Sequence, residues 1–163
     1  MTVPFIAGDE DGRLTAEVIR TLAASGLVDV VSSGGTYELQ VAINQNGSEN
    51  IGYRIDPQKV DGKVRNNLLA CEGRKTMGIE ATLYRGEEIA YGPYQLTSHA
   101  EYDYVDGDSI QDLTFIDAAG IVVTVLPFSL GQLESVEAAQ EAANRPLYSR
   151  IAQKIVDAIS SAW

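Results

Sequence analysis

The stretch "VPFIAGDEDGRLTAEVIRTL", residues 3–22, decides how the chain begins to fold. The short apolar run "TVPFIA", residues 2–7, predicts a buried strand. From Leu14 onward the pattern changes, because Leu14, Val18 and Leu22 recur every four positions. That spacing places the three side chains on one face of a helix. The sequence therefore predicts a strand, a polar corner and an amphipathic helix.

The corner at residues 8–12 carries Asp9, Glu10 and Asp11 between two glycines. Carboxylates are favoured at the positive N-terminal end of a helix by a few tenths to ~1 kcal/mol. Three like charges would repel phosphate from that helix end. A calcium-binding loop aligned on Gly12 would have apolar residues at two ligand positions. We therefore expect the corner to have a structural role.

Alternating apolar residues predict most of the remaining strands. The expected strands cover residues 27–31, 36–44, 51–55, 76–85 and 89–104. Turn chemistry predicts an Asn-Gly turn within 44–50, and polar composition predicts a loop over 56–67. Residues 76–85 and 89–104 should pair as an antiparallel hairpin across a tight turn. Later, a loop with a short helical turn is expected over 106–120, and a strand broken at Pro127 follows it.

The C-terminal region is helical by composition and spacing. Residues 133–144 are rich in Ala, Glu and Gln, and Pro146 marks either a new helix start or a kink. Leu147, Ile151, Ile155 and Ile159 then repeat at intervals of four, which predicts a broad apolar helix face. The predicted fold is an α+β two-layer sandwich. Two main helices pack on one face of a mixed, largely antiparallel sheet of four to six strands.

Composition sets the limits of this interpretation. The chain has 163 residues, of which 45% are hydrophobic and 21% charged, a globular balance suited to one domain. No apolar run reaches the ~20 residues that span a bilayer. The net charge of −11 opposes nucleic-acid binding, which requires clustered bases. The charge is uneven, because residues 54–85 carry +3 and the rest of the chain −14.

The sequence shows no catalytic or metal-binding constellation. His99 is the only histidine and lacks a nucleophile motif beside it, so a structural role is favoured over a hydrolase built around it. Cys71 is the only cysteine, which excludes the usual zinc sites and an intramolecular disulfide. An acidic segment suggests a calcium site less strongly than a solvated loop. Its candidate ligands are Asp103, Asp106, Asp108 and Asp112. We therefore expect no enzyme activity, no cofactor and no metal.

Several stretches, taken in order, resemble the lipopolysaccharide-assembly lipoprotein family, LptE. Residues 2–31, "TVPFIAGDEDGRLTAEVIRTLAASGLVDVV", are similar to the family's opening strand, polar corner, helix and second strand. The later stretches "TYELQVAI" (36–43), "LTSHAEYDY" (96–104) and "LYSRIAQKIVDAI" (147–159) resemble its next strand, a late strand and the closing helix. The resemblance makes residues 1–163 a single LptE-like domain, with 105–135 an insertion.

The resemblance implies a non-catalytic function at the cell envelope. Members of the family are periplasmic lipoproteins, anchored to the outer membrane through a lipidated N-terminal cysteine, which is expected to precede this sequence. They plug the β-barrel of the partner LptD, bind lipopolysaccharide and assist its export. Charge asymmetry, and no family motif, places the lipid contact on Arg54, Arg74, Lys75 and Arg85; the alternative role for each of them is a surface salt bridge. The alternative is a periplasmic binding or adaptor module without a barrel partner, similar to the N-terminal domain of the translocation protein TolB.

Overall fold

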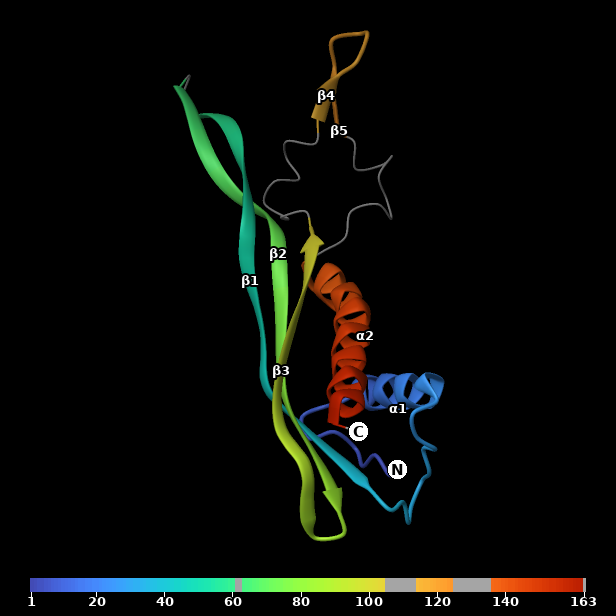
Figure 1. The fold of residues 1–163 in the computed structure, drawn as a ribbon. Helices are drawn as coiled ribbons and strands as arrows, with labels where there is room; N and C mark the ends of the chain where they lie inside the picture. The colour runs from blue at the N-terminus through green and yellow to red at the C-terminus, as the bar shows by residue number, and fades with distance from the viewer. Residues whose placement is uncertain (61–62, 105–113, 125–135, 163) are drawn as a thin grey trace. The chain divides into compact units, whose positions relative to one another are not determined.

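A computed structural model describes residues 1–60, 63–104, 114–124 and 136–162 (Figure 1). Its helices and strands are α1 (Arg13–Ser25), β1 (Glu38–Val60), β2 (Lys63–Arg85), β3 (Glu88–Asp103), β4 (Thr114–Ile116), β5 (Val122–Thr124) and α2 (Val136–Ala162). β1, β2 and β3 form an antiparallel sheet in that order, and β4 pairs with β5 in a separate sheet. In the described ranges no helix is both long and apolar enough to cross a membrane.

The chain divides into two compact units, and the three long strands and α2 contribute to both. Unit 1 contains residues 1–47, 75–100 and 144–163, and unit 2 contains residues 48–74 and 101–143. The fold is α+β, as predicted. The long sheet has three strands within the described residues, where the sequence suggested four to six.

The core of unit 1 follows the predicted periodicities. Leu14, Val18 and Leu22 on α1 are fully buried, which confirms the amphipathic helix. On β2 the alternating apolar side chains are also buried: Met77, Ile79, Ala81 and Leu83. The predicted face of α2 is buried along its whole length: Leu147, Ile151, Ile155 and Ile159. The predicted hairpin forms between β2 and β3, with Gly86 at its turn in the left-handed region.

Two predicted apolar strands form single bridges instead of ladders. Thr2 bridges Val31 and Glu38, and Ala7 bridges Ala42, all in parallel orientation. Val31 makes one such bridge, so residues 27–31 do not form the predicted strand. Residues 2–7 likewise lie outside the named strands, although the amide of Ala7 donates to the carbonyl of Val41 at 3.1 Å.

The expected turn at 44–50 and the expected loop over 56–67 are wrong for most of their length. β1 runs through Asn46-Gly47 and Pro57, and β2 resumes at Lys63. Pairing of two 23-residue strands satisfies the backbone groups that a loop would have exposed, and it overrides local turn preference. Pro57 is tolerated because β1 is the edge of the sheet, where a missing amide donor does least harm.

The later region departs from prediction in two further places. β4 lies within residues 106–120, which were expected to form a loop with a helical turn, and it pairs with β5, which lies in the segment predicted to be a strand. α2 is one helix that continues through Pro146, so this proline does not start a new helix. The predicted break at Pro127 lies outside the described residues.

Candidate functional site

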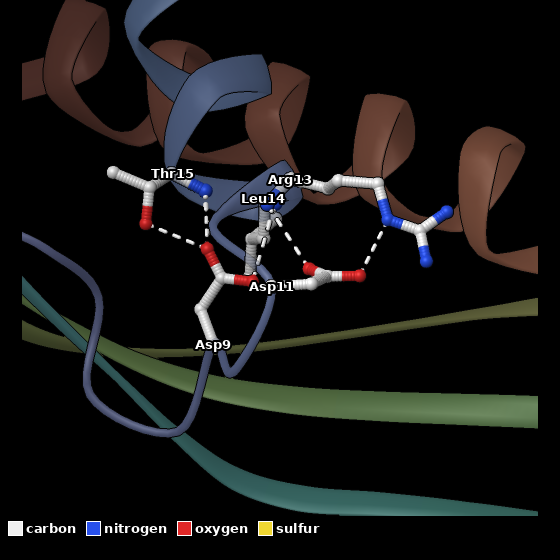
Figure 2. A network of polar contacts seen from close by, with 5 residues as sticks. All are labelled: Asp9, Asp11, Arg13, Leu14 and Thr15. Atoms are coloured by element: carbon white, nitrogen blue, oxygen red, sulfur yellow. Dashed lines mark hydrogen bonds and ion pairs between the residues drawn. The ribbon is translucent and has the colours of Figure 1, made fainter.

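The acidic corner at residues 8–12 is part of unit 1 and starts α1 (Figure 2). Asp9 is only 3% exposed, and its Oδ2 accepts hydrogen bonds from the Thr15 amide at 2.7 Å and the Thr15 hydroxyl at 2.6 Å. Oδ1 accepts a longer bond from the Leu14 amide at 3.4 Å. Asp9 therefore supplies the acceptors that the first turn of a helix lacks. Gly8 and Gly12 make the turn possible, at φ of +88° and +72°.

Asp11 has a separate role on the exposed side of the corner. It accepts a hydrogen bond from the Arg13 amide at 3.0 Å and pairs with the Arg13 guanidinium. These two interactions with Arg13 lower the pKa of the Asp11 carboxyl. The two aspartates therefore serve the helix start, which confirms the predicted structural role.

Arg74, one of the four predicted lipid contacts, lies in an ion-pair network across the strands of unit 2. Its Nη2 lies 2.7 Å from Oε1 of Glu101 on β3, and its Nη1 lies 3.8 Å from Oε1 of Glu49 on β1. The hydrogen bond with Glu101 raises the pKa of Arg74. Two carboxylates therefore already compete with any anionic ligand for this guanidinium.

The other three predicted contacts lie at separate places. Lys75 follows Arg74 on β2, so the two side chains point to opposite faces of the sheet. Arg85 ends the same strand ten residues later, about 33 Å from Lys75 at the rise of a strand, and its guanidinium lies 5.9 Å from the centroid of the Tyr37 ring. Arg54 is exposed on β1. Lys75 and Arg85, the two predicted contacts in unit 1, therefore do not form one site.

Arg54 and Arg74 both belong to unit 2 but lie at different positions along the paired strands β1 and β2. Gly52 lies against Glu72, since a Cβ on this glycine would meet the Glu72 side chain at 2.4 to 2.5 Å. Arg54 and Arg74 each lie two residues beyond this contact, and antiparallel strands run in opposite directions. Their separation along the sheet is therefore about 13 Å.

The candidate residues for catalysis and metal binding lie either on β2 and β3 or outside the described residues. The side chain of His99 is exposed on β3, and its carbonyl accepts a hydrogen bond from Arg150 of α2. Cys71 is a half-buried free thiol on β2. In the parts of the chain that the structure describes, no three His, Cys, Asp or Glu side chains cluster as metal ligands. Asp103 is exposed on β3, whereas the other predicted calcium ligands, Asp106, Asp108 and Asp112, lie outside the described residues.

Sequence analysis missed a groove of about 330 Å³ between α1 and α2 in unit 1. Its lining residues are Arg13, Ala16, Glu17, Arg20, Arg145 and Tyr148. The four residues from α1 follow the spacing i, i+3, i+4, i+7, which is a helix stripe next to the buried one. The spacing of the charged side chains on α1 is the feature of the sequence that indicates this groove. Apolar periodicity and net charge do not indicate it.

A second hollow, of about 300 Å³, lies on the sheet of unit 1. It is lined by Pro4, Phe5, Ala7, Glu38, Gln40, Val41, Ala42, Glu80, Thr82 and Tyr84. Its two charged residues, Glu38 and Glu80, are both acidic, and it contains none of the predicted basic contacts.

Comparison with solved structures gives matches of low identity over nearly the whole chain. A minor lipoprotein from Acinetobacter baumannii is 16% identical with a TM-score of 0.48, over 98% of this chain and 90% of that chain. The rare lipoprotein B from Shewanella oneidensis is 15% identical with a TM-score of 0.45, over 99% and 95%. A hypothetical protein from Chlamydia trachomatis is 6% identical with a TM-score of 0.49, over 98% and 96%.

No match was found among curated proteins. The profile of the lipopolysaccharide-assembly family, LptE, matches residues 1–159, almost the entire sequence. The match includes the corner, α1, all five strands described above and α2 as far as Ile159. The chain therefore belongs to the LptE family of lipopolysaccharide-assembly proteins.

Proposed function

We propose that this chain is a non-catalytic component of the outer-membrane lipopolysaccharide export machinery. It plugs and helps to assemble an LptD-like β-barrel, and it binds lipopolysaccharide. The observation that carries the proposal is the family match over residues 1–159. In the cell the protein is held at the periplasmic face of the outer membrane by a lipid on an N-terminal cysteine.

The proposed architecture is the two-layer sandwich expected for the family, with residues 105–135 inserted in a single domain. Contacts within unit 1 support the helix layer. Arg150 and Lys154 of α2 donate to the carbonyls of His99 and Thr97 on β3. These side chains attach the helix to the edge strand of the sheet, where unpaired carbonyls would otherwise be open to strand addition.

The proposed lipid contacts are Arg54, Arg74, Lys75 and Arg85. They act as separate contacts along an extended amphiphile, because the strands hold Lys75 apart from Arg85 in unit 1 and Arg54 apart from Arg74 in unit 2. Among them Arg54 and Arg85 are the most exposed, and Arg74 contributes least because Glu49 and Glu101 already engage it. The phosphates of lipopolysaccharide are the natural partners of guanidinium groups.

Co-expression with the LptD-like barrel of the same organism tests the assignment. A plug should copurify with the barrel at a constant one-to-one ratio through size-exclusion chromatography. Elution of this chain alone, with a barrel that folds without it, would favour the adaptor alternative and overturn the proposal.

The lipid contacts are tested separately by binding of purified lipopolysaccharide to the isolated protein. Arg54→Gln and Arg85→Gln should each weaken binding by about three- to tenfold, as expected for loss of a charged contact at an exposed site. Arg150→Gln is the matched control, since Arg150 is exposed but serves a strand carbonyl. Unchanged affinity in both test variants would remove these residues from the site.

A further inference from the structure

The groove between α1 and α2 concentrates positive charge on a strongly acidic protein. Arg13 and Arg20 lie at its two ends on α1, about 10 Å apart at the rise of a helix. Arg145 faces them from α2. With Glu17 and the neighbouring Asp11 counted, the groove carries a charge of +1, whereas the whole chain carries −11.

The one carboxylate in the lining, Glu17, pairs with one of these cations. Arg20 pairs with Glu17 through two nitrogens, with Nε at 2.9 Å from Oε2. This hydrogen bond is the largest cause that lowers the pKa of Glu17, and the charge of Arg145 acts in the same direction. Glu17 therefore holds the Arg20 guanidinium and competes with an anionic ligand for it.

The remaining lining is apolar or amphipathic. It consists of Ala16 and Tyr148, and the methylene stems of the arginines add further apolar surface. A volume of about 330 Å³ suits a headgroup with its first methylenes. A free inorganic anion would leave this apolar surface uncovered.

We infer that the α1–α2 groove binds the phosphate monoester of an anionic amphiphile, at a site separate from the strand residues 54–85. Arginine recognises phosphate through paired hydrogen bonds, and the apolar lining covers the start of the attached chain. The inference rests on the proposed function only for the natural ligand, lipopolysaccharide, which is itself a phosphate-bearing amphiphile. All the residues that line the groove belong to unit 1.

The test uses dihexanoyl phosphatidic acid, below the concentration at which it forms micelles, as the probe. Calorimetric titration should give saturable binding at least about tenfold tighter than inorganic phosphate or dihexanoyl phosphatidylcholine. Arg145→Gln should weaken binding about tenfold or more, the loss expected for one charged hydrogen-bonding partner. Glu17→Gln should tighten it, because the competing carboxylate is gone. Arg150→Gln, on the same helix but outside the groove, should change affinity less than twofold.

The opposite signs for Glu17→Gln and Arg145→Gln separate binding from damage to the fold. Affinity for inorganic phosphate equal to that of phosphatidic acid would overturn the amphiphile assignment. Absence of saturable binding, or indifference to both substitutions, would overturn the site. Either result leaves copurification with the barrel unaffected, so failure of this inference is distinct from failure of the proposed function.

Discussion

Replacing Asp9 by alanine tests the reasoning about the corner most sharply. The substitution removes the acceptor of three hydrogen bonds and leaves the Thr15 amide and hydroxyl buried without it. The bond from Leu14, at 3.4 Å, is long and contributes little. The two short bonds to a charged acceptor contribute about 1.5 kcal/mol or more each. We therefore expect a loss of about 3 kcal/mol in the free energy of unfolding, which is above the range of about 0.5–2 kcal/mol for a lost helix cap.

Urea unfolding followed by far-ultraviolet circular dichroism measures this loss. With a denaturant slope of about 2 kcal/mol per molar, the midpoint should fall by about 1.5 M. Asp9→Asn keeps one acceptor oxygen but loses the charge, so it should lie about halfway. Glu10→Ala is the matched control, since Glu10 is an exposed neighbouring acid and should change stability by less than about 0.5 kcal/mol. An Asp9→Ala midpoint equal to that of the control would refute the assigned role.

Two further predictions concern packing and pH. Gly73→Ala should destabilise the protein by about 1–2 kcal/mol in urea unfolding, because the new Cβ would meet the buried Tyr102 ring at 2.4 to 2.6 Å. Gly47→Ala, with open space around it, should be near neutral, and equal effects would contradict the packing argument. The Arg20 hydrogen bond lowers the pKa of Glu17, so the charged Glu17 carboxylate stabilises the fold at neutral pH. That stabilisation disappears as the pH falls below about 4.5. The unfolding temperature of Glu17→Gln should therefore fall less steeply than that of wild type as the pH is lowered. An equally steep fall in both proteins would refute the pairing of Glu17 with Arg20.

Local periodicity was sufficient to predict the core side chains wherever one face of a helix or strand is buried. The alternation around Ile79 on β2 and the four-residue spacing around Ile151 on α2 both predict the side chains found in the core. The acidic corner was also predictable, because helix starts favour carboxylates regardless of the rest of the fold. These features depend on neighbours within a few residues.

Features that depend on distant partners were not predictable in the same way. β1 continues through an Asn-Gly pair and Pro57 because β2 pairs with it, and no local signal reports that pairing. Arg74 was predicted to contact lipid, and no local signal identifies Glu49 and Glu101 as the carboxylates that the strands place beside it. The groove between the helices likewise requires two stretches more than a hundred residues apart to meet.

Depletion of this chain in the organism that encodes it tests the central claim, lipopolysaccharide assembly, most directly. The quantity to measure is newly made lipopolysaccharide reaching the outer leaflet, by surface labelling during depletion. The account predicts that surface delivery falls and that lipopolysaccharide accumulates at the inner membrane, with recovery when the chain is re-expressed. Unchanged surface delivery in cells that lack the chain would contradict it.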